Sequence, residues 1–378
     1  MKPIQSSEIT NAVIKELTGE TDLVAKDLSN IVDIGATLKD KVAVDEFVKA
    51  LAMKIGKTIF EVSPYRSLAP NIKKESFEWG GIIEKIKFKN VEFKDDPKYS
   101  LNAGDNLPLA KYIPPVAESV YYQNRDTGFL EITLPVKNRD FQQYFRDAQT
   151  YNNFITSIHD VVRNAISKRM DAVAFSTMNR MIVDTLTDTK VPTTKVKLVS
   201  KYNEIYKPTN PITSDNALFT PSFLQFAIAE ISKVYGDMRF TTKLFNLNKY
   251  ETNMYGRENL IILSDFENNI KRLLKPDVYN DQLLNLPGYS TIPIWQGWGL
   301  DGSFAKKSTV TMKVGKEDKT CSNIVAIAYD GDALGTYNDE VNARMGVNDP
   351  TGYTNLYYDL GISAYNDHDK NFVVFTLD

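Results

Sequence analysis

The sequence has very little of the chemistry from which most active sites are built. Its 378 residues include a single cysteine, Cys321, and only two histidines, His159 and His368. One cysteine excludes an intramolecular disulfide framework, and two histidines leave little for metal ligation. No stretch reaches the roughly 18 consecutive apolar residues that a membrane helix needs. We therefore expect no catalytic residues, no cofactor, no metal site and no membrane partner.

The composition also lacks a strong charge of either sign. The formal net charge is −3, with 42% hydrophobic and 25% charged residues, which is ordinary for a folded globular protein. Acidic side chains are concentrated after Cys321, and no segment is basic enough to indicate tight phosphate binding. The start, MKPIQSSEIT, has no apolar core of a signal peptide, so we expect no secretory signal and synthesis in the cytoplasm. The length suits two domains better than one.

The first 76 residues are predicted to form an arm. Short helical patterns occur near Ile9–Leu17 and Val44–Ile59. Pro64 and Pro70, with polar neighbours, indicate an extended linker after them.

A long two-stranded projection is predicted over residues 78–135. Ile86 and Phe88 alternate with lysines, which is the period of a strand, and the phase changes at Asn90, where we expect a bulge. After a polar tip marked by prolines, SVYYQNRDTGFLEITLP returns as the second strand. Because a lone two-stranded ribbon is marginally stable in water, we expect it to rest on another surface, such as a second copy of the chain.

The run from Phe141 to Leu186 contains neither glycine nor proline. From Phe154 to Ile182 its apolar residues recur at steps of three and four, which predicts one amphipathic helix. About 35 helical residues would span roughly 50 Å. Because Lys168 and Arg169 interrupt any heptad pattern, we favour a helix lying across a sheet over a coiled coil.

A mixed region of helices and strands is predicted from about Thr187 to Lys319. A helix begins at Thr220 and Pro221 and ends before Gly236. ENLIILSD indicates a strand that enters a helix, FENNIKRLLK, while IPIWQGW and STVTMKVG are strand-like. The last part, with NIVAIAYD and TNLYYDLGISAYNDHDKNFVVFTLD, is rich in strands, and NDHDKN predicts a hairpin turn.

Two patterns imitate ligand-binding motifs. Gly297, Gly299 and Gly302 spell GxGxxG, but a β-like segment follows where a dinucleotide site needs a helix. DGDALG at residues 330–335 begins like a calcium loop, but residues 334 and 341 are Leu and Val where ligands belong. We therefore predict a glycine-rich turn beside tryptophans in the first case and a strand-ending turn in the second.

The histidines and the cysteine are predicted to be structural. His159 follows Ile158 in the long helix, and Asp160 is expected to point elsewhere around that helix, which leaves His159 without the carboxylate that a general base needs. His368 is expected to be solvated in the hairpin turn. Cys321 has no CxxC partner and is expected to be a small buried or half-buried residue.

Aromatic residues are plentiful, with 20 Tyr, 19 Phe and 3 Trp. Tyrosine suits surfaces that become buried while one hydrogen bond is kept. The pairs Tyr121–Tyr122 and Tyr357–Tyr358 fit either that use or ordinary strand packing.

The order of these parts resembles the major capsid protein of tailed phages, which has the Hong Kong 97-like fold. Two stretches carry the likeness, GFLEITLPVKNRDFQQYFRDAQTYNNFITSIHDVVRNAI and YDGDALGTYNDEVNARMGVNDPTGYTNLYYDLGISAYNDHDKNFVVF. Both are similar to such proteins from phages of Gram-positive hosts, with a small podovirus as the suggested source. The likeness covers the chain from about Trp79 to its end.

The resemblance implies an α+β fold in five parts. These are an N-terminal arm (1–76), an extended β-hairpin loop (77–136), a peripheral domain with a spine helix (137–186), a mixed α/β axial domain (187–320), and C-terminal strands that return to the peripheral and axial sheets (321–378). It also implies a non-enzymatic head protein that self-assembles, through pentamers and hexamers, into the icosahedral shell of a virion. A separate scaffolding protein, a portal and non-specific proximity to packaged double-stranded DNA are the implied partners.

Nine residues are expected to contact neighbouring subunits: Lys94, Asp95, Asp96, Tyr99, Tyr121, Tyr122, Arg125, Tyr357 and Tyr358. Three other functions stay open at this point. They are the shell of an encapsulin-type nanocompartment, an α/β enzyme with an unrecognised site, and a phage tail or decoration component.

Overall fold

The computed structural model describes residues 3–20, 23–41, 46–47, 49–51, 54, 72, 82–88, 117–123, 128–137, 145–274, 288–296, 307–348 and 353–378. The chain divides into a main unit, Met1–Glu78 with Asp126–Asp378, and a small unit, Trp79–Arg125.

The small unit contains an antiparallel pair of strands, β1 (Ile82–Phe88) and β2 (Ala117–Gln123). The prediction of a two-stranded ribbon is therefore confirmed, but only the first part of the predicted return strand, Ser119 to Gln123, pairs with β1. Residues 128–137 form a separate strand, β3 (Gly128–Lys137), which pairs in the main unit with β11 (Tyr353–Asn366) and not with β1. An alternating pattern predicts a strand but does not identify its partner. The expected bulge at Asn90 and the tip lie outside the described residues.

A five-stranded mixed sheet organises one part of the main unit, with the strand order β4-β12-β9-β5-β6. Its strands are β4 (Lys195–Lys197), β12 (Phe372–Thr376), β9 (Ile324–Asp330), β5 (Glu258–Leu263) and β6 (Ser290–Ile292). Every residue of β9 and β12 is buried, as expected for central strands covered on both faces.

Helices and this sheet enclose the larger core, here called the sheet core. Its contributors include α6 (Leu198–Tyr206), α7 (Ser214–Ala217), α8 (Pro221–Asp237) and α9 (Ser264–Leu274), and its buried side chains include Trp295, Phe223, Phe266, Phe372 and Phe375. A short 3₁₀ turn, η3 (Pro192–Thr194), precedes β4, and a hairpin of β7 (Val310–Val314) and β8 (Glu317–Cys321) forms its own two-stranded sheet.

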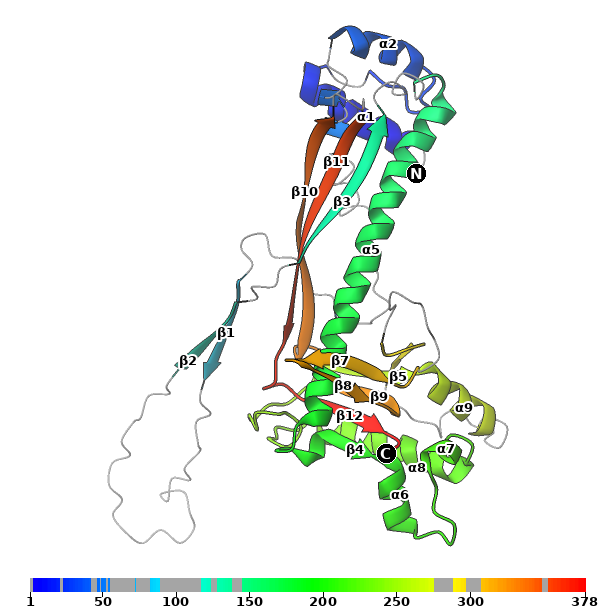
Figure 1. Cartoon of the computed structure of the whole chain (residues 1–378), viewed down its shortest axis with the longest axis vertical. Coiled ribbons are helices and arrows are strands. Elements are labelled where there is room, and N and C mark those ends of the chain that lie inside the picture. Colours follow the sequence, from blue (N-terminus) through cyan, green and yellow to red (C-terminus); the bar gives the residue numbers. More distant parts are fainter. Residues whose placement is uncertain are drawn as a thin grey trace, which may run out of the picture. The chain divides into compact units, whose positions relative to one another are not determined.

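A second, three-stranded antiparallel sheet has the order β10-β11-β3, where β10 spans Leu334–Asn348. Its β10–β11 register shifts between Asn338 and Val341. The long helix α5 (Ala148–Thr187) contacts all three strands and runs beside them in Figure 1. The prediction of a helix lying across a sheet is confirmed.

Helix α5 has 40 residues, a length of about 60 Å at 1.5 Å per residue. It extends beyond both ends of the predicted apolar stripe, Phe154 to Ile182. Asp147 is the N-cap, and its Oδ1 accepts a hydrogen bond from the Thr150 backbone N–H at 2.7 Å. The cap satisfies one of the free amides of the first turn and fixes where the helix begins.

The first half of α5 belongs to a separate N-terminal core. Helices α1 (Pro3–Thr18) and α2 (Ile31–Lys41) contact α5. The core contains Ile9, Val13, Ile14, Val24, Leu28, Ile31, Phe47, Ala50, Leu51, Phe145, Tyr151, Phe154, Ile155, Ile158, Val162, Ile166, Met170, Tyr358 and Ile362. The helix predicted near Ile9–Leu17 is confirmed, and most of the one expected at Val44–Ile59 lies outside the described residues.

Side-chain hydrogen bonds hold the pieces of the N-terminal core. The Asn11 side-chain amide makes two hydrogen bonds with the backbone of Val24. Its Nδ2 donates to the Val24 carbonyl at 3.0 Å, and its Oδ1 accepts from the Val24 N–H at 2.8 Å. The Thr10 and Tyr151 hydroxyls lie 2.7 Å apart, joining α1 to α5. The first part of the expected arm is thus packed against the long helix.

Two other expectations were wrong in detail. The NDHDKN segment is not the turn of a hairpin, because β11 pairs with β10 and β3 whereas β12 pairs with β9 and β4. Apolar β12 fills a central place in the five-stranded sheet, so residues 367–371 cross between sheets. Gly236 lies within the last turn of α8 and not beyond it.

Candidate functional site

The crossing segment carries a small cluster of charged groups against the end of α5. Asp184 accepts a hydrogen bond from Arg180 Nε at 3.0 Å, and His368 Nε2 lies 3.3 Å from the same carboxylate oxygen. Burial alone raises the pKa of Asp184, but the contacts with His368 and Arg180 outweigh burial and bring that pKa below its ordinary value. His368 is therefore held over a carboxylate, whereas we expected it to be solvated.

The calcium-like loop is closed by an arginine. Asp330 is fully buried, and Arg257 donates to both of its carboxylate oxygens, at 2.9 and 3.0 Å. The Asp332 N–H also donates to Asp330 Oδ1, which forms the predicted strand-ending turn between β9 and β10. The hydrogen bonds to Asp330 raise the pKa of the Arg257 guanidinium. Among the described residues no group of three or more possible ligands could hold a metal ion.

His159 is buried, as expected, but it does meet a carboxylate. Its Nδ1 lies 3.1 Å from Asp160 Oδ1, so the expectation that Asp160 points elsewhere was wrong. A flexible side chain at the adjacent helix position can fold back along the surface, which helix spacing alone does not show. The contact lies within one turn of α5 and gives the His159 imidazole a structural hydrogen-bond partner.

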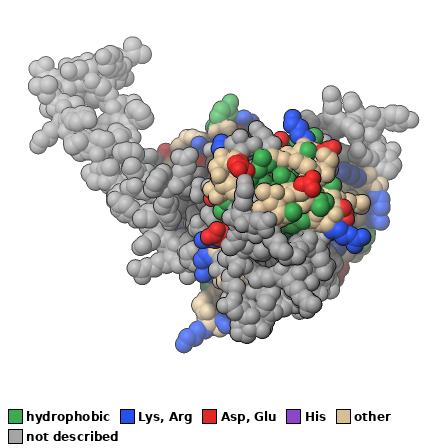
Figure 2. All heavy atoms as spheres, turned by 90° about the horizontal axis from the view of Figure 1, so that it is seen from above, with side chains coloured by type: hydrophobic (Ala, Val, Ile, Leu, Met, Phe, Trp, Pro, Cys, Tyr) green, Lys and Arg blue, Asp and Glu red, His purple; other side chains and the backbone are tan. Residues whose placement is uncertain are grey.

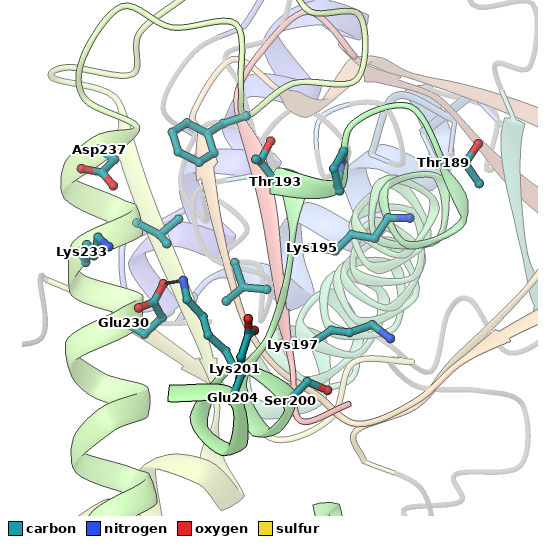
Figure 3. Close-up of a pocket in the computed structure, with 14 residues that line it drawn as sticks. Thr189, Thr193, Lys195, Lys197, Ser200, Lys201, Glu204, Glu230, Lys233 and Asp237 are labelled. Atoms are coloured by element: carbon teal, nitrogen blue, oxygen red, sulfur yellow. Dashed lines mark hydrogen bonds and ion pairs between the residues drawn. The ribbon is translucent and has the colours of Figure 1, made fainter. Parts of the chain in front are cut away.

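A cleft of about 570 Å³ lies between α8 and the segment from η3 to α6 (Figure 3). Four lysines line it, yet two of them have structural partners. Lys201 reaches from α6 to pair with Glu230 of α8, which is only 6% exposed, and Lys195 donates to the carbonyl of Asp188 at the end of α5. The cleft contains the ion pair that anchors α6 to α8, and its lining contains neither a cysteine nor a histidine.

Cys321 is a half-buried free thiol, as predicted, and burial raises its pKa. A raised pKa keeps the thiol protonated and makes it a poor nucleophile. The GxGxxG glycines lie outside the described residues. None of the described helices is long and apolar enough to cross a membrane.

The nine expected contact residues have different positions. Lys94, Asp95, Asp96, Tyr99 and Arg125 lie outside the described residues. Tyr121 and Tyr122 are in β2, opposite Glu84 and Ile83. Tyr357 is half-buried on β11, with the Arg344 guanidinium 5.8 Å from its ring centroid. Tyr358 is 1% exposed and belongs to the N-terminal core, so it offers no surface to another subunit.

Large exposed apolar side chains are the surface feature that sequence reasoning missed. Around the sheet core they are Ile205, Tyr206, Phe219, Phe240, Leu244, Tyr255 and Tyr289, each at least 37% exposed. On the N-terminal helices Ile4 and Val32 are half exposed, and Figure 2 shows hydrophobic side chains there interspersed with acidic and basic ones. No pattern in the sequence separates these residues from their buried neighbours.

The structure indicates the class of protein before its family is considered. Its ionisable clusters are satisfied by internal partners, while aromatic side chains are presented to solvent, which suits a structural subunit that works through contacts. Its order of parts is a two-stranded ribbon, a long helix across a three-stranded sheet, and a five-stranded mixed sheet with helices. This is the Hong Kong 97-like arrangement expected from the resemblance.

The chain belongs to the Phi29-like phage major capsid protein family, whose model matches residues 10–376. It is accordingly a shell-forming phage head protein, and neither the encapsulin nor the enzyme alternative is favoured. No curated protein matches the sequence.

Several solved phage structures contain similar chains. One, described as the head fiber and inner core protein of native bacteriophage P68, contains a chain at 11% identity and TM-score 0.49, with 84% of this chain and 86% of that chain covered. The capsid of Staphylococcus phage Andhra gives 10% identity and TM-score 0.48, covering 82% and 83%. The capsid of cyanophage P-SCSP1u gives 10% and 0.45, covering 83% and 90%. The family assignment rests on the family model.

Proposed function

We propose that this subunit forms pentamers and hexamers of an icosahedral virion shell around double-stranded phage DNA, with the small unit lying over a neighbouring subunit. One observation carries the proposal. The β1–β2 ribbon pairs with no further strand among the described residues and forms a compact unit of its own. Because such a ribbon is marginally stable alone, a neighbouring copy supplies the surface on which it rests.

The main unit divides into two functional parts in this proposal. Helix α5 with the three-stranded sheet forms the peripheral domain, and the five-stranded sheet with α6, α8 and α9 forms the axial domain at five- and six-fold centres. The last strands serve both, since β10 and β11 belong to the first sheet and β9 and β12 to the second. Residues 1–76 act as the arm and 77–136 as the extended loop, with β3 at its base.

Contacts between copies involve the ribbon and its tip in this proposal. The proposed contact residues are Lys94, Asp95, Asp96, Tyr99, Tyr121, Tyr122, Arg125 and Tyr357; the buried Tyr358 is left out. A separate scaffolding protein and a portal assist assembly. The net charge of −3 fits a container whose lining holds packaged DNA weakly, because tight phosphate binding needs many basic contacts.

Deleting Lys94–Leu109, the tip of the ribbon, tests the role of the small unit. We expect a folded subunit that assembles poorly, measured by negative-stain microscopy of particles and by far-UV circular dichroism of the subunit. A matched variant replaces the same residues with a glycine-serine linker of equal length, which keeps the reach of the loop but removes its side chains. Normal particles from both variants would contradict the proposed role.

The content of purified particles separates a virus shell from a nanocompartment. Long double-stranded DNA inside the particles is the expected result. A single enclosed cargo protein and no DNA would overturn the proposal that the shell holds a genome.

A further inference from the structure

The two most exposed of the large apolar side chains in the described part of the chain, Phe240 and Tyr255, lie in one loop. Residues 238–257, here called the α8–β5 loop, join helix α8 to strand β5. Phe240 is 75% exposed, Tyr255 68% and Leu244 56%. Large apolar side chains exposed together mark interaction sites more often than chance.

This loop is held rigidly. Thr242 and Thr252 exchange two backbone hydrogen bonds, at 3.0 and 3.1 Å. Asn246 accepts from the Tyr250 N–H through Oδ1 and donates to the Tyr250 carbonyl through Nδ2. Its ends are anchored by two fully buried methionines, Met238 and Met254. A loop that is already ordered loses little conformational entropy when its exposed aromatic side chains are bound.

A second exposed apolar patch lies at the other end of α8 and is here called the helix-start patch. It consists of Ile205, Tyr206 and Phe219, which are 56%, 59% and 61% exposed. The Tyr206 ring packs edge-on against Phe226 of α8, with ring centroids 5.9 Å apart. Phe219 immediately precedes the N-cap of α8.

Both patches combine an aromatic ring with an arginine. The Arg239 guanidinium lies 4.9 Å from the ring centroid of Tyr255 in the α8–β5 loop. The Arg272 guanidinium lies 5.6 Å from the centroid of Phe219 in the helix-start patch. Aromatic residues and arginine are enriched in protein interfaces and at their energetic centres.

The two patches are separated by the length of a rigid helix. Helix α8 has 17 residues, about 25 Å, with one patch at each end. A ring with five- or six-fold symmetry needs head-to-tail contacts between two different surfaces, and these patches are two such surfaces. They suit a head-to-tail contact, in which one patch meets the other patch of the next copy and rotation closes a ring.

We propose that the α8–β5 loop of one copy docks on the helix-start patch of the next copy around each ring of subunits. The inference rests on the proposed assembly of copies into pentamers and hexamers and assigns a pair of surfaces to it. The partner is a second copy of this chain because the family builds shells from repeated copies, and the two patches have matching apolar, aromatic and arginine composition.

The size of the contact predicts how rings form. Three large side chains at these exposures give roughly 400 Å² per patch. The pair then buries roughly 800 Å², less than the about 1,200 Å² of a stable two-body interface. An isolated dimer is accordingly weak, whereas in a closed ring every copy makes two such contacts. Rings should therefore appear cooperatively with few dimers beside them.

Two double variants of the full chain test the pairing. The loop variant carries Phe240→Ser and Tyr255→Ser, and the helix-start variant carries Ile205→Ser and Phe219→Ser. Native mass spectrometry over a concentration series should show rings for the wild type. For each variant alone, the concentration needed for rings should rise about tenfold or more. Thermal melting checks that both variants fold.

Mixing the two variants gives the decisive measurement. In a head-to-tail contact, the intact loop of one variant meets the intact helix-start patch of the other, and their remaining ends are inactive. Because a single contact of this size is weak, the mixture should show heterodimers at the highest concentrations of the series, above the dimer level of either variant alone, and no rings. Folded variants that yield no heterodimer, or that form rings like the wild type, would overturn the inference.

A control and a reference separate the possible failures. The control variant carries Ile4→Ser and Val32→Ser on the N-terminal helices, which are 49% and 50% exposed and lie outside both patches, and it should form rings normally. A wild-type chain that stays monomeric would remove the proposed assembly together with the inference. If the wild type forms rings and both patch variants form them equally well, the inference is wrong but the proposed assembly stands.

Discussion

The sheet core and the N-terminal core are built in different ways, although both use side chains of α5. In the sheet core, β9 and β12 are buried along their whole length and lie between other strands. In the N-terminal core, each helix contributes one face, and residues as far apart in the sequence as Ile9 and Ile362 belong to the same core. The sheet core is stabilised by burial of both faces of its central strands. The N-terminal core is stabilised by packing between the apolar faces of separate segments.

The difference shows in how polar groups are used. The N-terminal core depends on single side chains that join separate segments, such as Asn11 to the backbone of Val24 and Thr10 to Tyr151. The central strands of the sheet core are joined by regular backbone ladders. In a ladder, many hydrogen bonds form and break together. We therefore expect a single substitution to destabilise the N-terminal core locally, but to destabilise the sheet core as a whole.

The largest expected effect comes from a cavity in the sheet core. Phe375 lies in β12 and is fully buried, so Phe375→Ala should lower the free energy of unfolding by about 3–5 kcal/mol. Urea denaturation measures the loss. Hydrogen exchange should show weaker protection in β9 and β5 as well as in β12. An effect confined to β12 would contradict the expectation that these strands are destabilised together.

A smaller and more local effect is expected from Gly35 in α2. A Cβ at this position would lie 2.7 Å from the ring of Phe145. Gly35→Ala should therefore push α2 away and cost about 1–3 kcal/mol through overpacking. Hydrogen exchange should lose protection in α1 and α2 while β9 stays protected. Equal losses in both cores would contradict their different construction.

The same substitution in α8 should have the opposite sign. A Cβ at Gly236 meets no atom within 4 Å, and this glycine lies inside the last turn of the helix. Gly236→Ala should stabilise the chain by about 0.5–1 kcal/mol, because alanine loses less backbone entropy in a helix than glycine. Thermal unfolding measures the gain, and a loss of stability would show that the helix end is not as open as described.

The smallest expected effect is a pH dependence at the end of α5. The pKa of Asp184 in the folded chain is below its ordinary value, so the folded state binds fewer protons there than the unfolded state. Its contribution to stability is therefore present above about pH 4 and is lost as the pH falls through the folded pKa. Asp184→Asn should flatten the acid limb of the stability curve, measured by urea unfolding between pH 3 and 6. An unchanged limb would contradict a role for this carboxylate.

Elements were predictable wherever their signal was local. The steps of three and four from Phe154 to Ile182 gave α5, and the continuous apolar run NIVAIAYD gave β9. Partners were not predictable. Residues 117–123 and 128–137 looked like one strand but belong to different sheets, and NDHDKN looked like a hairpin turn but crosses between sheets. Pairing depends on which core a strand fills, and that information is not carried by neighbouring residues.

Candidate contact residues were predictable only in kind. Tyrosine pairs suggested surfaces, but Tyr358 faces the N-terminal core because the register of β11 places it opposite Ile132 and Ala343. Phe240 and Tyr255 carry no distinguishing pattern. They lie on either side of the backbone bridge between Thr242 and Thr252, a feature of the folded loop. The capping role of Asp147, three residues before Thr150, was a local signal that could have been used.

Helix α5 places Ile155 in one core and Ile182 in the other on a single continuous rod. A rotation of that rod about its axis would withdraw side chains from both interiors at once, so neither interior can rearrange while the other stays still. Strain applied to one end of the rod is consequently resisted by the packing around the other, and the main unit is stiffer against torsion than either interior would be alone.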